Sequence, residues 1–597
     1  MLAGSEIHED AYFAAMARFL RLPFIPDIDP AGITDTDGLD VQLLRPNQIR
    51  LAHAKKAPQV AIVPEAIRLA ELAALIDRLP ALRQGLVITT PSQIRSAVWA
   101  AGAKRRARAA VTDLFEKRTV SSARIVLSGA QGFAAGSSAA TITAALLIAP
   151  QITLTTLHLT LSCLYLGSLL LRLAALAHDK HHPHAPHETV DIDDGNLPTY
   201  TILIALYREA DVAGQLVRSL ERIDWPHSLL DIKLVCEGDD QETIAALEAL
   251  SLKPHFEIVR VPPCAPRTKP KALTYALCAA RGEFLAVYDA EDRPHPLQLR
   301  EALQRFRAGP QRLACLQAPL VISNARNSIF SALFALEYSA LFRGLLPMIA
   351  DYRLPLPLGG TSNHFRTSVL QQVGGWDPFN VTEDADLGLR LYRHGYHAAT
   401  LRRQTLEDAP TSLNVWLGQR TRWYKGWMQT WLVTVRHPAT HIRDMGLRGA
   451  FVFHLMIGGM LISALLHPLL FVLLGWGIYI CLTEPFPARA LLDQPLIAID
   501  AVNILGSYIL FVRLGLRSMT EHERQRVGRR WMAIPVYWMM TSLAAWSAAN
   551  ELRTKPFFWN KTPHRPVDAA SGEQNRADTP HFSACNSVQG SWSLTFY

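Results

Sequence analysis

The sequence predicts an α/β domain with a mostly parallel sheet, placed between two groups of transmembrane helices and preceded by a small α+β domain. Three observations support this prediction. Apolar strands alternate with helical segments over 198–445, as in βαβ units. Uncharged runs occupy 125–171 and 449–483, each long enough to enter a bilayer. Short strands and helix-periodic segments fill residues 1–120.

The chain of 597 residues is long enough for several domains, and its hydrophobic residues (49%) and charged residues (19%) are unevenly distributed. We therefore divide it into six segments. They are an accessory or regulatory α+β domain (1–120), two transmembrane helices (121–177), a His-rich linker (178–197), the α/β domain with an interface helix (198–445), three or four transmembrane helices (446–552) and a polar C-terminal tail (553–597).

The first uncharged run, 125–171, is too long for one crossing at ~1.5 Å per residue. We expect two helices, broken near Pro150. Seven cations lie shortly before this run, and such an excess places the N-terminal domain in the cytoplasm, with the α/β domain on the same side after two crossings. The seven are Lys104, Arg105, Arg106, Arg108, Lys117, Arg118 and Arg124.

The second uncharged run, 449–483, is long for one span and short for two, with His467 and Pro468 at its middle. Further candidate spans are 494–513 and 531–550, and the arginine-rich loop between them should be cytoplasmic. Two spans within 449–483 would place this loop outside, whereas one kinked helix would place it inside. The sequence does not decide between these alternatives.

Composition excludes some classes of function. The net charge of +8 and the pI of about 9.1 come from basic residues beside the predicted spans, so we expect no nucleic-acid partner. Seven cysteines without a CxxC pair indicate buried thiols in a reducing compartment. The first residues lack the pattern of a signal peptide. The histidines of 178–187 suit either a metal site or a solvated linker, and we favour the linker.

Two apolar strands of the α/β domain end in polar side chains. TILIALYREAD carries Tyr207 and Glu209, and DIKLVCEGDDQET carries Glu237, Asp239 and Asp240. Open α/β sheets bind ligands at the carboxyl ends of their strands, where acids can hold a nucleoside. A solvated acidic turn is the alternative for any one of them.

Cations follow in RTKPKALTYALCAARGE, where Arg267, Lys269 and Lys271 lie before or at the start of a helix. Cations beside the free N–H groups of a helix start suit a diphosphate. A basic surface loop is the alternative.

A third strand, in FLAVYDAEDRPHP, delivers Asp289, Glu291 and Asp292. Alternate side chains of an extended segment point the same way, so Asp289 and Glu291 can share one cation. Hard ions such as Mg²⁺ bind carboxylates and a diphosphate together, and they stabilise a departing nucleotide diphosphate as a Lewis acid.

Two helices complete the pattern. Thr382, Glu383 and Asp384 open a predicted helix that ends at Gly395, where Asp384 is either a reactive group or a cap. In TSLNVWLGQRTRWYKGWMQTWLV, residues 419, 422 and 423 share one helical face. There an arginine can bind phosphate and a tryptophan can stack on a sugar. The tryptophans of this helix indicate that it lies on the membrane interface.

In this order, DAED, TED and QRTRW between membrane segments resemble the family 2 glycosyltransferases, especially bacterial cellulose-synthase-like β-glycan synthases. The resemblance covers 198–445 and includes GGTSNHFR (359–366), which is similar to the family's acceptor loop. It implies a GT-A nucleotide-sugar fold with a mixed sheet and inversion at the anomeric carbon.

The resemblance also implies roles for single residues. Asp289 and Glu291 match the metal-binding DxD motif, although Glu291 stands where the motif has aspartate, and Asp384 matches the general base. The match of Glu237 is open, because Asp239 or Asp240 can replace it. The residues expected to bind substrate are Tyr207, Glu209, Glu237, Lys271 (near the diphosphate), Glu383, Gln419, Arg420, Arg422 and Trp423.

These roles predict a multi-pass inner-membrane enzyme with a cytoplasmic catalytic domain. It would use Mg²⁺ or Mn²⁺ and a UDP-sugar, with UDP-glucose favoured, to extend and export a growing β-linked glycan. Transfer of one sugar to a lipid or short glycan is the alternative. The N-terminal domain resembles part of that of type II secretion ATPases, which implies cyclic di-GMP or a partner protein as its ligand, although the Arg-Leu-Gly repeat of such domains is absent.

Overall fold

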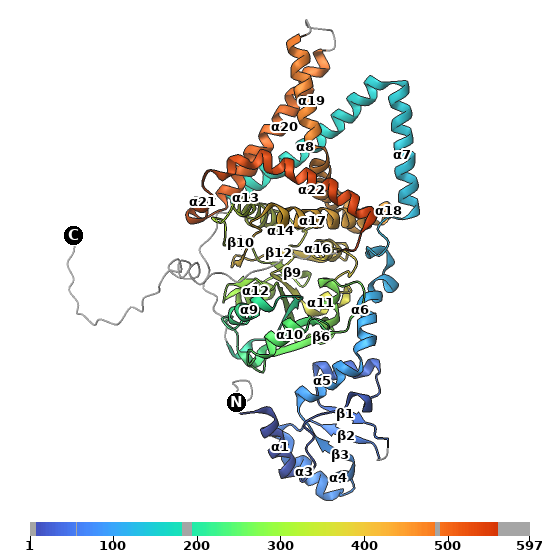
Figure 1. Ribbon diagram of the computed structural model, residues 1–597, viewed down its shortest axis with the longest axis vertical. Helices are drawn as coiled ribbons and strands as arrows, with labels where there is room; N and C mark the ends of the chain where they lie inside the picture. Colours follow the sequence, from blue (N-terminus) through green and yellow to red (C-terminus); the bar gives the residue numbers. More distant parts are fainter. Residues whose placement is uncertain (1–6, 55–56, 182–193, 484–489, 559–597) are drawn as a thin grey trace, which may run out of the picture.

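The computed structural model describes residues 7–54, 57–181, 194–483, 490–558, and it stacks three layers (Figure 1). The N-terminal domain lies at one end, the sheet domain in the middle and the long apolar helices at the other end. Most of the predicted linker and nearly all of the predicted tail lie outside the described residues.

The N-terminal domain is a small α+β unit, as expected. Its sheet has the order β1-β2-β3, with an antiparallel and then a parallel pair. Its elements are α1 (Glu9–Leu20), α2 (Val41–Leu44), β1 (Gln48–Leu51), β2 (Gln59–Ile62), α3 (Leu69–Arg78), α4 (Leu82–Gly85), β3 (Leu86–Ile88), α5 (Pro91–Ala101) and α6 (Ala103–Lys117).

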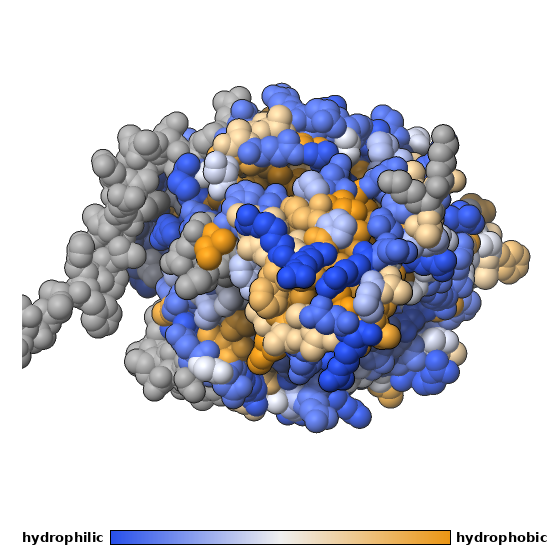
Figure 2. Space-filling view, turned by 90° about the horizontal axis from the view of Figure 1, so that it is seen from below, coloured by the Kyte–Doolittle hydropathy of each residue, from blue (hydrophilic) through white to orange (hydrophobic). Residues whose placement is uncertain are grey.

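This domain docks on the middle layer through Trp99. The Trp99 ring stacks on Tyr275, with ring centroids 5.2 Å apart, and its indole Nε1 donates to Glu257 Oε1 at 2.8 Å. Seen from its free end, the molecule shows apolar patches between hydrophilic side chains (Figure 2). The exposed apolar residues of this domain include Phe19, Ile67 and Leu79.

The middle layer is built on a seven-stranded mixed sheet of order β12-β9-β11-β7-β4-β5-β6. The strands β7, β4, β5 and β6 run parallel, and β11 is antiparallel to both of its neighbours. The mixed α/β sheet is therefore confirmed. Its strands are β4 (Tyr200–Leu206), β5 (Leu230–Glu237), β6 (Phe256–Val261), β7 (Phe284–Tyr288), β9 (Leu313–Gln317), β11 (Asn363–Arg366) and β12 (His397–Thr400).

Alternate residues of each central strand face opposite sides, and both sides are covered. On β4, Ile202 and Ile204 pack with α9, α10 and α12, whereas Leu203 packs with α11. A smaller sheet of order β10-β13-β8 adjoins this layer. The further elements are α9 (Ala213–Leu220), α10 (Gln241–Glu248), α11 (Lys269–Leu277), β8 (Arg293–Pro294), α12 (Gln298–Ala308), β10 (Leu320–Ile322), α15 (Thr367–Gln372), α16 (Glu383–Arg393) and β13 (Thr405–Glu407).

Within the described residues, five helices are long and apolar enough to cross a membrane, by length and composition. Two form the expected pair that breaks at Pro150: α7 (Gly129–Ile148) and α8 (Pro150–His181). The others are Ile329–Asp351, Pro438–Leu469 and Pro495–Arg517.

The run 449–483 is a single helical element rather than two spans. It comprises the end of α18 (Pro438–Phe453), a π-helical segment (His454–Gly458) and α19 (Gly459–Thr483), which contains Pro468. The next helix, α20 (Ala490–Arg517), returns toward the middle layer (Figure 1). The arginine-rich loop with α21 (Glu521–Val527) therefore lies beside that layer, where Arg343 pairs with Glu523 at 2.9 Å.

Three helical features differ from expectation. The apolar helix Ile329–Asp351 belongs to the protein core, because 67% of its most apolar stretch is buried. It consists of α13 (Ile329–Tyr338), a π-helical segment (Ser339–Leu345) and α14 (Leu346–Asp351). The candidate span 531–550 forms α22 (Ile534–Thr554), which is absent from the five helices above and packs along α17 (Leu413–Thr434). Consequently α17 is covered by protein: Trp416, expected at a membrane interface, is fully buried and donates to Tyr537.

Candidate active site

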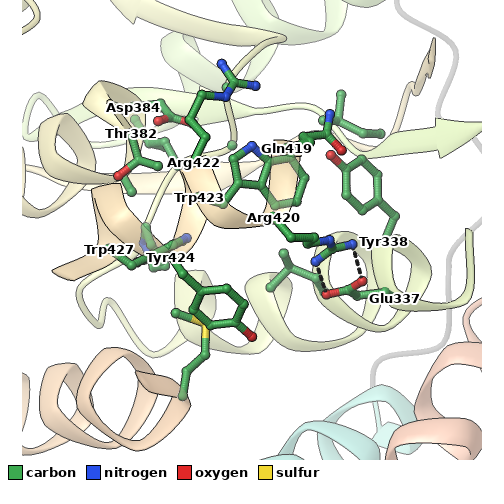
Figure 3. Close-up of a pocket in the computed structure, with 18 of the residues that line it drawn as sticks. Glu337, Tyr338, Thr382, Asp384, Gln419, Arg420, Arg422, Trp423, Tyr424 and Trp427 are labelled. Atoms are coloured by element: carbon green, nitrogen blue, oxygen red, sulfur yellow. Dashed lines mark hydrogen bonds and ion pairs between the residues drawn. The ribbon is translucent and has the colours of Figure 1, made fainter. Parts of the chain in front are cut away.

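One cavity of about 480 Å³ joins the carboxyl edge of the central sheet to the apolar helices. Volumes of this size suit small-molecule and cofactor sites. Every predicted site residue except Lys271 lines it, and Figure 3 shows Asp384, Gln419, Arg420, Arg422 and Trp423 among them. They are Tyr207, Glu209, Glu237, Asp289, Glu291, Glu383, Asp384, Gln419, Arg420, Arg422 and Trp423.

Hydrogen bonds from the backbone shape the turn that carries the acids after β7. The Asp289 N–H donates to Asp292 Oδ2 at 2.8 Å and to Thr361 Oγ1 at 3.1 Å, which fixes the turn that follows the strand. Asp292 is buried beneath this turn and does not line the cavity. Asp289 and Glu291 both do, as the alternation of an extended segment predicts.

The site carries more carboxyl groups than nearby cations can neutralise. Burial and the charge of Asp384 raise the pKa of Glu383 to about 7. Burial, with the charges of Asp292, Glu291 and Asp289, raises the pKa of Glu407 well above its usual range. Crowded buried carboxylates are costly unless a cation compensates them.

This donor set fits a divalent cation bound together with its ligand. Among the described residues, no three His, Cys, Asp or Glu side chains are grouped to hold a metal by themselves. Mg²⁺ commonly uses one or two carboxylates plus substrate phosphates. Asp289 already contacts one cation, the ammonium of Lys269, which shows that its carboxylate is accessible to positive charge.

Asp384 stands in the first turn of α16, where the helix dipole favours carboxylates. Burial raises its pKa, and the charge of Lys269 opposes that shift. A Cβ atom at Gly360 would lie 3.3 Å from Asp384 Oδ2, so the lack of a side chain at 360 leaves this carboxylate room. A raised pKa beside an open cavity is a property of a proton acceptor.

The two lysines of α11 lie in different surroundings, and Lys271, which was expected near the diphosphate, does not line the cavity. Lys271 is fully buried and away from the cavity, where Nζ pairs with Glu237 Oε1 at 2.7 Å and donates to the Cys264 carbonyl at 3.0 Å. Lys269 lines the cavity, contacts Asp289 and donates to the Gly360 carbonyl at 2.6 Å. Of the two lysines, Lys269 therefore faces the cavity, and Lys271 pairs with Glu237 beneath it.

A pair of matched substitutions separates these roles. Lys269→Met should lower kcat/KM for the donor about 10- to 100-fold with little change in Tm, because a charge-assisted contact is worth about 1.5–3 kcal/mol. Lys271→Met should lower Tm strongly, because breaking a buried ion pair costs about 3–5 kcal/mol. Steady-state kinetics with the sugar donor and thermal unfolding, both measured on the two variants, check these expectations. A donor defect in Lys271→Met at unchanged Tm would contradict the assignment.

The open choice among the acids after β5 is resolved by their contacts. Asp240 caps α10 by accepting from Thr243 N, and Asp239 pairs with Arg267 at 2.6 Å. Only Glu237 of the three lines the cavity.

Helix α17 contributes six side chains to the cavity wall, from Gln419 to Trp427. Arg422 points to the same side as Asp384 (Figure 3), and its charge interacts with Glu383, Asp289 and Asp384. Trp423 lies nearly parallel to Tyr338, at an interplanar angle of 15°. The wall thus offers a guanidinium beside the acids and an aromatic face next to them.

Arg420 is a structural neighbour of this set. Its Nη1 donates to Glu337 Oε1 at 2.7 Å, and its guanidinium lies over the Phe334 and Trp423 rings at 4.6 and 4.7 Å (Figure 3). Arg420 is therefore engaged by Glu337 and by the rings around it, and its contact with Trp423 holds that side chain in place.

Two acids of the cavity wall escape the sequence prediction, Glu337 and Glu407, and Lys269 is named there only as one of three candidate cations. Glu407 ends a short strand, like the acids that were singled out, so the same signal could have found it. Glu337 is the one acid in the apolar segment 329–350, and an acid within an apolar helix is itself a signal. One carboxyl oxygen of Glu407 has no hydrogen-bond partner among the described residues.

Comparisons with known proteins agree with this site. Residues 198–426 match the family model described as "Glycosyltransferase like family 2". The β-monoglucosyldiacylglycerol synthase of Synechocystis sp. is 27% identical over 45% of this chain and 55% of its own length. Cellulose synthase 2 of Novacetimonas hansenii is 28% identical over 41% of this chain and 15% of its own length.

A solved mannosyltransferase from Pyrobaculum calidifontis, in complex with GDP-Man and Mn²⁺, is 17% identical with a TM-score of 0.41, covering 67% of this chain and 99% of its own. The chain spans little more than half the length of the first curated relatives that it matches.

The family match does not reach the N-terminal domain, so it lends no support to the resemblance with type II secretion ATPases or to cyclic di-GMP. Residues 198–426 are therefore similar to the family 2 glycosyltransferases, and the match leaves the rest of the chain unassigned.

Proposed function

We propose that the chain is a membrane-bound inverting glycosyltransferase that transfers sugar from a UDP-sugar, with UDP-glucose as the favoured donor, to a growing β-linked glycan. One observation carries this proposal. The cavity that contains the acids, Lys269 and Arg422 continues between α8, α19, α20 and α22, so donor site and membrane helices share one space.

The donor diphosphate lies against Lys269 and Arg422 in this proposal, with Asp289 and Glu291 as the ligands of Mg²⁺ or Mn²⁺. The metal, when bound, neutralises charge that develops on the departing diphosphate. Asp384 accepts the proton of the acceptor hydroxyl, whose oxygen forms the new bond to the anomeric carbon while the bond to the diphosphate oxygen breaks. Trp423 and Tyr338 provide an aromatic wall for a sugar ring.

The membrane arrangement follows from charge and topology. The cations before α7 and the arginines around α21 flank the apolar helices on the side of the catalytic layer. By the positive-inside rule, both the N-terminal and catalytic domains would lie on the cytoplasmic side of a bacterial inner membrane. The N-terminal domain serves as an accessory module with cyclic di-GMP or a partner protein as its proposed ligand.

A second function uses the same site. The relative from Synechocystis sp. is named as a synthase of a glycolipid, and the Novacetimonas relative as a cellulose synthase. The mainly apolar wall formed by Leu455, Ile457 and Phe511 suits a lipid acceptor as well as a glycan path. Transfer of a single sugar to a lipid is therefore the alternative.

The test is incubation of membranes that contain the protein with several labelled UDP-sugars and Mg²⁺ or Mn²⁺, followed by size and linkage analysis of the product. A β-linked polymer from one donor is the expected result. A chloroform-soluble product with one sugar would favour the alternative. Neither hydrolysis nor transfer with any donor would contradict the proposal as a whole.

A further inference from the structure

A polar cluster joins α8 to α20 in the midst of apolar helices. Asp500 is 2% exposed and accepts from Ser162 Oγ at 2.7 Å, and its other carboxyl oxygen lies 2.5 Å from His158 Nε2. Asn503 is 3% exposed, and its Nδ2 donates to the Ser162 carbonyl at 3.0 Å. Ionisable and polar side chains between membrane helices are costly, and they commonly mark a functional site.

Asn503 differs from the rest of the cluster because it reaches the cavity. It lines the cavity together with Ser507 of the same helix and Tyr165 and Ser168 of α8. Its side-chain oxygen Oδ1 is buried and has no hydrogen-bond partner among the described residues. Holding two helices together explains the bonds of Asp500 and Ser162, but it does not explain a buried acceptor atom that is left unused.

The orientation of the Asn503 amide is set by its neighbour. Rotating the amide by half a turn would place Oδ1 against the Ser162 carbonyl oxygen, two acceptors without a proton between them. The NH₂ group must therefore face Ser162, which leaves Oδ1 as the group that a ligand can meet. An oxygen acceptor of this kind selects a hydrogen-bond donor, and among neutral ligands that enter an apolar passage the usual donor is a hydroxyl group.

We propose that Asn503 Oδ1 binds a hydroxyl group of the acceptor in the part of the cavity between α8 and α20, with the Ser162 carbonyl holding the amide in place. The inference rests on the proposed glycosyltransfer and adds a residue that recognises the acceptor far from the donor. The ligand is a polyol, either a sugar unit of a glycan or the headgroup of a lipid acceptor. Asn503 is a positioning residue, because the reacting atoms lie at the other end of the cavity.

The experiment compares Asn503→Leu, which is similar in size, with Ser168→Ala, which removes another polar atom of the same cavity. Full-length protein in membranes receives a radiolabelled UDP-sugar. Incorporated sugar is measured in the chloroform-soluble and ethanol-insoluble fractions, and total UDP release is measured in parallel. The readout is the ratio of incorporated sugar to UDP released.

Loss of one hydrogen bond to the acceptor should lower this ratio about threefold to tenfold in Asn503→Leu, while water still attacks the donor and UDP release continues. Ser168→Ala should keep the wild-type ratio. A fall confined to the chloroform-soluble fraction identifies a lipid headgroup, and a fall in the insoluble fraction identifies a glycan.

An unchanged ratio in Asn503→Leu, with or without a lower Tm, would overturn the inference and leave the cluster as a bond between helices. If Asn503→Leu does not fold, Asn503→Ser replaces it, since the shorter side chain withdraws the oxygen from the cavity, and the same fall is required. Absence of both UDP release and incorporation in the wild-type protein would instead contradict the proposed function.

Discussion

Asp384→Asn should lower glycosyl transfer by about 10²- to 10⁴-fold, the range contributed by a placed general base, while the affinity for UDP stays close to that of the wild type. Asparagine keeps the size of the side chain in the first turn of α16 but cannot accept the proton of the acceptor hydroxyl. Single-turnover transfer and equilibrium UDP binding, both measured with Mn²⁺, check this expectation.

The pH dependence of the two proteins supplies a further comparison. Burial raises the pKa of Asp384, and only its deprotonated form can act as the base. Transfer by the wild type should therefore decline as the pH falls through that pKa, whereas the residual rate of Asp384→Asn should lack this limb. Full activity in Asp384→Asn would remove Asp384 from the role of base.

Asp289→Asn should reduce transfer by about 10²- to 10³-fold, the usual effect of removing one electrostatic group that stabilises a transition state. The charge of Asp289 faces the cavity beside Lys269, and its loss leaves Glu291 as the only acid of the pair. Activity should depend steeply on Mn²⁺ concentration in the wild type and weakly in the variant.

Glu291→Asp is the matched control for this substitution, because it keeps a carboxylate at the position where the family motif has aspartate. It should retain most of the wild-type activity, with at most a changed preference between Mg²⁺ and Mn²⁺. Transfer that persists at full rate in excess EDTA would refute a divalent cation at Asp289 and Glu291.

Six acids of the cavity could be predicted from sequence because each follows an apolar strand or opens a helix, whereas Glu337 lies inside a helix. Strands of one parallel sheet end at the same edge, so Glu237 and Asp289 had to lie near each other once the strands were recognised. The arrangement of Gln419, Arg422 and Trp423 followed in the same way from helical spacing.

The lysines of α11 could not be assigned by such reasoning. Lys269 and Lys271 are two residues apart, which places them on different sides of the helix, and the side that faces the cavity is decided by tertiary packing. The same applies to Trp416 and to α22, whose apolar residues read as membrane-facing. They cover one another instead, and local hydrophobicity does not distinguish burial in protein from burial in lipid.

Helix α11 touches both the donor site and the accessory domain. Lys269 in its first turn reaches the Asp289 carboxylate, and Tyr275, about 9 Å further along at ~1.5 Å per residue, stacks against Trp99. A short helix behaves as a stiff rod, so its two ends cannot shift independently. A displacement of the N-terminal domain at Trp99 should therefore also shift Lys269 relative to Asp289, which would couple that domain mechanically to the proposed donor site.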